Sequence, residues 1–260
     1  MSGQGRFVEA AGNEYFGQWY DDMKHGFGSE QFIDGNRYTG YYYNNEKSGL
    51  GKYEWSDGRV YVGTWQQDVI SEEGVYKWPD GKAYNGQWSY NMKHGKGCYS
   101  WEDGRLYYGY YDNDQKHGHG IYRWADGKIY IGPWVKGEKG DGIRVFIFPN
   151  GEIKKNNWEN NSKGPYLEVT EEERADFLAQ RDEAFTALEQ IEQRFRALCA
   201  EIDRQNQRNE DQVQRHQQEA QPNQEQVEQM LEQYKQEQEE ARQEQIEEQQ
   251  QQMEEEIQMQ

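Results

Sequence analysis

A period of 23 residues governs this chain from its first residues to about position 153. Three columns repeat in register: a tyrosine, a glycine two places later, and a tryptophan or tyrosine four places later. A fixed period of this size is typical of an array whose units bury their faces only against neighbouring units. We therefore predict a solenoid-like array and expect function to reside in a repeated surface. The columns are Tyr15, Tyr38, Tyr61, Tyr84, Tyr107 and Tyr130; Gly17, Gly40, Gly63, Gly86, Gly109 and Gly132; and Trp19, Tyr42, Trp65, Trp88, Tyr111 and Trp134.

Each unit has the pattern of one β-hairpin. The Tyr-x-Gly-x-Trp segment alternates with a period of two, which places Tyr15 and Trp19 on the same face of a strand. A loop of about six residues containing Lys-His is expected next, followed by an alternating Gly-x-Gly strand. Asp-Gly pairs such as Asp34-Gly35 then indicate a tight turn. The fold class predicted is mainly β: a single twisted antiparallel sheet of hairpins, followed by C-terminal α-helices.

The glycines inside these strands predict where the aromatic rings lie. A strand glycine costs about 0.5 to 1 kcal/mol relative to alanine, so a repeated one suggests that a ring covers the bare backbone. The rings then form one continuous face, and an exposed patch of that size exceeds what a soluble monomer leaves uncovered. We expect residues 171–204 or a segment of another protein to cover it. The candidate partner-binding residues on this face are Tyr42, Trp65, Trp88, Tyr111 and Trp134.

Two units depart from the pattern. In the third unit Glu72 replaces a glycine and Ile70 replaces the lysine, so its loop is expected to differ from the others. In the sixth unit Gly140 and Gly142 come one residue early, and residues 154–158 are a shifted remnant of the opening strand. Terminal repeats are commonly atypical because they cap the array.

The repeated columns resemble the MORN (membrane occupation and recognition nexus) repeat family, whose units combine Tyr-x-Gly-x-Trp, a Lys-x-His-Gly-x-Gly variant and Asp-Gly. Residues 23–28, 92–97 and 115–120 match the middle motif closely, and the resemblance covers residues 3–158. It implies about six full repeats with flanking half repeats. For function it implies a scaffold of the kind found in radial spokes and other ciliary assemblies, with membrane-junction proteins and enzyme subunits as further relatives.

Beyond residue 165 glycine disappears and the sequence becomes helical in pattern. Thr170 and Glu173 form a predicted capping box, and an apolar stripe follows at heptad spacing. We predict a repeat array over residues 1–160, a linker over 161–169, an amphipathic helix over 170–221 and a Gln/Glu-rich helical or disordered tail over 222–260, with Pro222 as a break. The predicted helix interface, toward the sheet or a second partner, consists of Phe177, Phe185, Leu188, Ile191, Phe195, Leu198 and Ile202.

Charge is distributed unevenly along the chain, whose formal net charge is −19. Residues 1–165 hold 22 acidic and 20 basic side chains, whereas residues 166–260 hold 26 and 9. Such an acidic tail repels nucleic acid and anionic lipid, which argues against both as main partners. The two cysteines and the lack of an apolar run of membrane length favour a soluble protein in the cytoplasm.

Catalytic and metal-binding patterns are not found in the sequence. The repeated histidines His25, His94 and His117 are at least one hairpin, roughly 10 Å, apart, which is too far for shared zinc coordination. The glycines belong to a hairpin array and match no nucleotide-binding loop. We expect no enzyme activity and no cofactor.

One recurrent basic feature supports an alternative function. Lysines in the Lys-His segments could line one rim of the sheet and meet phosphoinositide headgroups of a membrane, although neighbouring aspartates and the acidic tail oppose this. The alternative site residues are Lys24, Lys47, Lys93 and Lys116.

The preferred prediction is a non-enzymatic scaffold with protein partners in a large assembly. The aromatic face binds one partner, and the helix, which has coiled-coil character, contacts a second partner or the sheet. The family resemblance implies a cytoskeletal location in the axoneme of a cilium or flagellum, such as a radial spoke. A homodimer and a hetero-oligomer both remain open.

Overall fold

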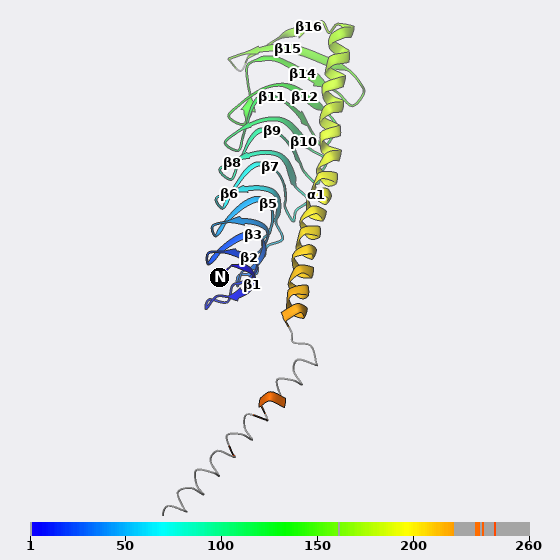
Figure 1. Cartoon of the computed structure of the whole chain (residues 1–260). Coiled ribbons are helices and arrows are strands. Elements are labelled where there is room, and N and C mark those ends of the chain that lie inside the picture. The colour runs from blue at the N-terminus through cyan, green and yellow to red at the C-terminus, as the bar shows by residue number, and fades with distance from the viewer. Residues whose placement is uncertain (1, 161, 221–231, 235, 237–241, 243–260) are drawn as a thin grey trace, which may run out of the picture. The chain divides into compact units, whose positions relative to one another are not determined.

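The protein forms one open antiparallel sheet of hairpins followed by a long helix, as the computed structural model shows (Figure 1). The structure describes residues 2–160, 162–220, 232–234, 236 and 242. It confirms the predicted fold class. The strands are β1 (Gly3–Val8), β2 (Glu14–Tyr20), β3 (Met23–Gln31), β4 (Arg37–Tyr43), β5 (Glu46–Glu54), β6 (Val60–Gln66), β7 (Val69–Lys77), β8 (Ala83–Ser89), β9 (Met92–Ser100), β10 (Leu106–Asp112), β11 (Gln115–Arg123), β12 (Ile129–Val135), β13 (Glu138–Lys139), β14 (Gly142–Ile147), β15 (Ile153–Glu159) and β16 (Ser162–Leu167), and the helix is α1 (Glu171–Ala220).

The strands pair in chain order, each with the next, apart from β13, which is a short side strand on β12. The glycine columns lie opposite one another across the hairpins of the first five units, for example Gly17 opposite Gly28 and Gly86 opposite Gly97. Adjacent pairing of consecutive hairpins gives the array that the 23-residue period predicts.

The connection within each unit is shorter than the sequence suggested. Asp21 and Asp22 both have positive φ and form the two-residue turn between β2 and β3, and Asn44 and Asn45 do the same one unit later. Asn and Asp tolerate this left-handed conformation, which the type I′ hairpin turn requires. The prediction of a six-residue loop is therefore wrong. The Lys-His segments lie inside strands, where their side chains point to one face or the other.

The C-terminal end of the array also differs from the prediction. Residues 162–167, placed in a linker, form β16 and pair with β15. The sixth unit slips register as expected, because its second strand is divided into β13 and β14. The sheet thus extends to Leu167, three residues before the Thr170 N-cap of α1.

Helix α1 begins with the predicted capping box. The Glu173 amide donates to Thr170 Oγ1 at 3.2 Å, and the Thr170 amide donates to Glu173 Oε2 at 3.0 Å. The chain divides into two compact units, Met1–Glu210 and Asp211–Gln260. The predictions for residues 222–260, including the break at Pro222, lie almost entirely outside the described residues; residues 232–234, 236 and 242 are helical.

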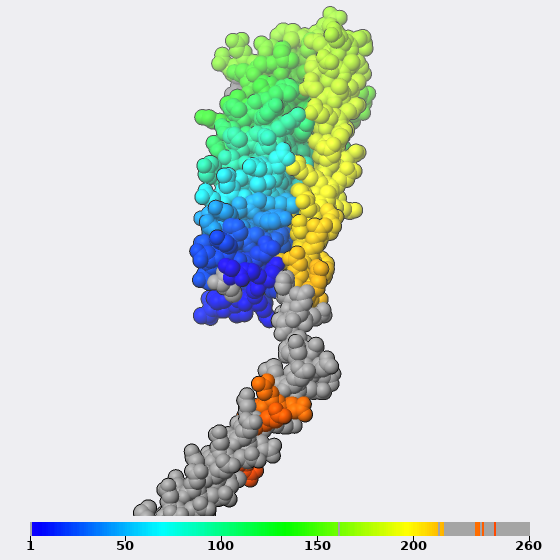
Figure 2. Space-filling model, in the orientation of Figure 1, coloured from blue at the N-terminus to red at the C-terminus, as the bar shows by residue number. Residues whose placement is uncertain are grey.

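The described helix up to Glu210 packs along one face of the sheet, as Figure 1 and Figure 2 both show. Side chains of α1 and of the sheet share one apolar cluster. All seven predicted interface residues belong to it, and Ile191 and Ile202 are buried there. The sheet contributes Phe27, Val62, Val75, Ala83, Cys98, Leu106, Ile121, Ile129, Ile131, Val145 and Ile147.

Helix α1 runs back across the strands in reverse order. Its first turn contacts β15 through Lys155 and Glu173, and a residue near the end of the unit, Asn209, contacts β1 through Gln4. Intermediate contacts join Lys96 to Glu183 at 3.0 Å and Lys77 to Glu192. These polar contacts flank the apolar cluster and fix the register of the helix on the sheet.

Candidate functional site

The opposite face of the sheet carries the repeated aromatic residues, which form a second cluster with no contribution from α1. We call its buried members the aromatic core. They are Tyr15, Tyr38, Tyr61, Tyr84, Tyr107, Tyr130, Tyr42, Tyr111, Trp65, Trp88 and Trp134, together with Ile70 and Tyr76.

The first five column tyrosines each cover two glycines, and Tyr130 covers Gly132 alone. A Cβ atom added at Gly86 or at Gly97 would lie within 2.6 Å of the Tyr84 ring or hydroxyl, so neither position accepts a side chain. The Tyr84 hydroxyl donates to the Gln87 carbonyl at 2.9 Å, and the other column tyrosines make the equivalent bond. Burial raises the pKa of these phenols well above the usual value, so they remain neutral donors. The predicted contact between ring and glycine is confirmed.

The five predicted partner-binding residues belong to this aromatic core. Tyr42, Trp65, Trp88, Tyr111 and Trp134 are only 3 to 7% exposed. Trp65 packs edge-on against Tyr61 and Tyr38, and its indole N–H donates to the Gly51 carbonyl at 3.3 Å. These rings cover one another. The expectation that α1 or a foreign segment must cover them is therefore wrong, because α1 lies on the other face.

The column lysines also lie on this aromatic face. The Lys47 ammonium is 5.6 Å from the centre of the Tyr38 ring and 5.8 Å from that of Trp65, and it pairs with Asp68 at 3.2 Å. Such cation–π contacts stabilise a partly desolvated ammonium. The lysines therefore pack over rings instead of forming an exposed basic rim, and phosphoinositide binding through Lys24, Lys47, Lys93 and Lys116 stays a prediction that these contacts do not favour.

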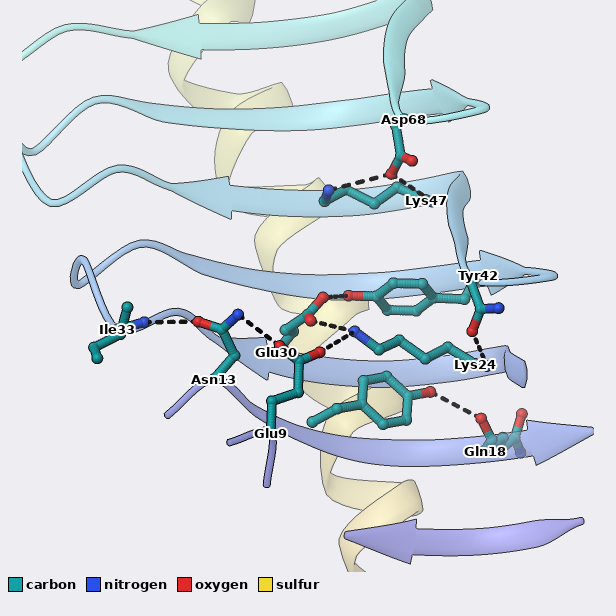
Figure 3. A network of polar contacts seen from close by, with 11 residues as sticks. Glu9, Asn13, Gln18, Lys24, Glu30, Ile33, Tyr42, Lys47 and Asp68 are labelled. Atoms are coloured by element: carbon teal, nitrogen blue, oxygen red, sulfur yellow. Dashed lines mark hydrogen bonds and ion pairs between the residues drawn. The ribbon is translucent and has the colours of Figure 1, made fainter. Parts of the chain in front are cut away.

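Carboxylates compensate most of these lysines. Lys24 pairs with Glu30, which also accepts a hydrogen bond from the Tyr42 hydroxyl at 2.8 Å; Figure 3 shows this network in front of the sheet, with α1 behind it. Lys93 pairs with Asp114 at 2.6 Å. In each of the Lys47 and Lys93 pairs, the acid comes from the turn of the following unit.

Lys116 and Lys139 differ from the other column lysines, because within the described part of the chain neither forms an ion pair. Asp114 lies in the turn beside Lys93. The equivalent turn position beside Lys116 is Gly137, which has no carboxylate. The Lys116 ammonium lies 4.6 Å from the centre of the Trp134 ring and 4.7 Å from that of Tyr122. Burial, with the charges of Lys139 and Arg105, lowers the pKa of Lys116 to about 8.

A row of rings, most of them partly exposed, lies along the aromatic core and shares Tyr76 with it. We call it the ring ladder: Tyr53, Trp55, Tyr76, Trp78, Tyr99, Trp101, Tyr122 and Trp124. Consecutive centroids are separated by 4.6, 5.2, 4.3, 5.5, 4.5, 6.0 and 5.0 Å. Tyr76 is 8% exposed, and the other seven rings are exposed to an intermediate degree. The row is continuous over four units.

The ring ladder was not among the residues predicted to bind a partner, although its columns were expected on the aromatic face. The signal was available in the sequence. Trp55, Trp78, Trp101 and Trp124 come directly before the turn that ends each unit, and rings at the margin of a sheet have neighbours on fewer sides. The central Trp column has strands and rings around it and is therefore buried.

A metal site and a membrane-spanning helix each place a requirement on the described residues. No group of three or more His, Cys, Asp or Glu side chains is placed there to hold a metal ion. Likewise, no described helix combines the length and the apolar character needed to cross a bilayer.

Comparison with solved structures gives only remote similarity. The chain resembles the TCP domain of Drosophila melanogaster Sas-4 in complex with a proline-rich motif of Ana2, with 13% identity, a TM-score of 0.35, and coverage of 58% of this chain and 88% of that chain. The TCP10c domain of Sas-4 gives 16% identity, a TM-score of 0.28, and coverage of 58% and 97%. Virginiamycin B lyase from Staphylococcus aureus gives 11% identity, a TM-score of 0.17, and coverage of 62% and 72%. Scores this low carry no functional argument.

Comparison by sequence is more informative. No curated protein matches the chain. The family model described as MORN repeat matches five consecutive segments, residues 15–37, 38–58, 61–83, 84–104 and 107–129. These segments form the hairpins that carry the whole ring ladder and the aromatic core apart from Tyr130 and Trp134. The chain therefore contains five MORN repeats, over residues 15–129.

Proposed function

We propose that this protein is a non-enzymatic scaffold that binds a protein partner through the ring ladder. The observation that carries the proposal is the continuous row of eight rings from Tyr53 to Trp124, most of them partly exposed. Tyr and Trp are the side chains that most often dominate the binding energy of protein interfaces. The fold supports the same role, because a rigid repeat array offers a long continuous surface to a partner.

The two faces of the sheet have separate roles in this proposal. Helix α1, up to Glu210, stiffens the array by packing on the face away from the ladder. The ladder then stays free for a partner. A second contact through the acidic residues that follow, and a homodimer or hetero-oligomer, remain predictions.

Quantitative co-purification tests the proposal. The tagged chain is compared with a Trp55→Ala/Trp101→Ala variant and with Tyr43→Ala, which removes an exposed ring outside the ladder. We expect a defined set of proteins to be lost with the ladder variant and kept with Tyr43→Ala. Equal recovery with all three chains, at equal thermal stability, would contradict the proposal.

The cellular setting is proposed from family resemblance alone. We propose a cytoskeletal location in a ciliary or flagellar axoneme, such as a radial spoke, because scaffolds built of these repeats and helices occur there. Fold analogy is a weak argument for function, so the test must be direct. Mass spectrometry of isolated axonemes should find the protein; its absence from that fraction would remove this part of the proposal.

A further inference from the structure

The ring ladder has a spacing that selects among partner conformations. One unit advances the array by two strands, about 9.6 Å. A polyproline II helix completes a three-residue turn in about 9.3 Å. The difference accumulates to only about 1 Å over four units. An extended strand repeats its side chains every two residues, about 6.7 Å, and an α-helix repeats every 5.4 Å, so neither matches the ladder.

Ring chemistry agrees with this spacing. Tyr76 and Trp78, with centroids 4.3 Å apart, form a tilted pair, and Trp78 and Tyr99, 5.5 Å apart, connect it to the next unit. Grooves lined with such rings bind proline-rich segments, since the polyproline II helix is preformed and loses little conformational entropy on binding. Each unit therefore presents one ring pair for each three-residue turn.

Two lysines at one end of the ring ladder distinguish that end from the other. At the end of the ladder, Lys116 lies over Trp101 and Tyr122, and Lys139 lies 4.7 Å from the centre of the Trp124 ring. Neither ammonium has a carboxylate partner within residues 2–160, whereas Lys47 and Lys93 at earlier positions of the column do. Two uncompensated positive charges beside the rings complement a carboxylate brought by the partner.

We propose that the ring ladder binds a proline-rich peptide segment in the polyproline II conformation, with prolines at every third residue and a carboxylate at the end that meets Lys116 and Lys139. This inference rests on the proposed function, because it takes the ladder as the binding surface. About 10 residues span the distance from Tyr53 to Trp124, since the first and last ring pairs lie three unit repeats, about 29 Å, apart and each residue advances about 3.1 Å. A peptide of about 13 residues therefore covers the whole ladder.

Synthetic peptides test the spacing. Three 13-residue peptides are titrated into the full chain by isothermal calorimetry: one with prolines at every third position and two terminal aspartates, one of the same composition with prolines at every fourth position, and one with asparagine in place of the aspartates. We expect the first to bind at least tenfold more tightly than the second and about fivefold more tightly than the third. Equal affinity for the first two would overturn the proposed register.

Matched variants locate the peptide. Trp78→Ala should lower the affinity for the first peptide at least tenfold, whereas Tyr43→Ala should change that affinity by less than twofold. Lys116→Met should remove the preference for aspartate over asparagine, and Lys93→Met, in the same column but paired with Asp114, should keep it. Far-UV circular dichroism confirms that each variant is folded. Loss of the aspartate preference in both lysine variants would overturn the charge assignment.

The peptide and co-purification results separate this inference from the proposed function. If none of the peptides binds while the ladder variant still loses its cellular partners, the polyproline II assignment is wrong and the scaffold proposal stands. If the peptides do not bind and no partner depends on the ladder, both are wrong. Binding of the first peptide that is lost with Trp78→Ala supports the inference directly.

Discussion

The two faces of the sheet are buried in different ways. On the aromatic face, the column tyrosines and tryptophans cover one another and the glycines between strands. On the other face, aliphatic residues such as Val62, Val75 and Ile131 share their apolar cluster with side chains of α1. A repeated column can cover itself, because every unit supplies both the ring and the glycine. A face whose residues vary from unit to unit needs one specific partner element.

The largest effect is expected where a ring covers a glycine. Gly86→Ala would place a Cβ atom 2.6 Å from the Gly97 Cα atom and closer still to the Tyr84 hydroxyl. Overpacking of this kind costs about 3 kcal/mol. Gly137→Ala is the matched control: its φ of +87° is strained for alanine, but no atom lies within 4 Å, so we expect a cost of about 1 kcal/mol. Urea unfolding followed by circular dichroism measures both, and equal losses would contradict the account of the aromatic core.

The helix-covered face should respond less to a single truncation. Ile191→Ala removes a side chain that is 4% exposed, and we expect a loss of about 2 kcal/mol, the lower end for buried aliphatic truncations, because a docked helix can shift to fill the space. Gln193→Ala, at an exposed position of the same helix, should change the free energy of unfolding little. An equal effect of the two in urea unfolding would show that α1 does not pack as described.

A smaller effect is expected at the start of α1. Thr170→Ala removes the hydroxyl that accepts the Glu173 amide at 3.2 Å, which should cost about 1 kcal/mol. Thr186→Ala, within the helix and exposed, serves as the control and should be neutral or slightly stabilising. Thermal unfolding followed at 222 nm distinguishes them. No difference between the two variants would mean that the capping box is not used.

The smallest effect is expected at the exposed ion pairs between α1 and the sheet. Lys96→Met removes the pair with Glu183, which is 3.0 Å long and largely exposed to solvent. Such pairs contribute at most about 0.5 kcal/mol and are screened by salt. The free energies of unfolding of the variant and the parent chain should therefore differ slightly at low salt and become equal at high salt. A loss above about 2 kcal/mol would show that charge, and not apolar contact, holds the helix.

The sequence predicted the repeated parts of the molecule better than the individual ones. The period placed the hairpins, the contact of Tyr84 with glycine, and the sheet order, because those features recur and each copy supports the others. The capping box at Thr170 and the apolar stripe through Ile191 were readable for a similar reason, since both follow fixed helical spacings.

Features that depend on three-dimensional packing were harder to predict from the sequence. Residues 171–204 or a foreign segment were expected on the aromatic face, whereas α1 lies on the other one. Both faces carry apolar residues, and only the packing of the rings against one another shows which face is left for the helix. The lysines were placed in loops although Asn44-Asn45 is a signal for a two-residue turn. Glu72 was expected to alter the third unit, yet it takes the left-handed conformation (φ 57°) that Gly49 holds in the unit before, and β6 and β7 remain paired.

One measurement tests the difference between the two faces most directly. Cys98 lies under α1, where burial raises the pKa of its thiol to about 12 and shields it from alkylation. The double substitution Leu188→Glu/Phe195→Glu should release α1 from the apolar cluster. In this variant we predict rapid alkylation of Cys98, located by mass spectrometry. The tryptophan emission maximum should stay unchanged. A red shift of the tryptophan emission together with Cys98 exposure would show that α1 protects the aromatic face as well, and would contradict the account.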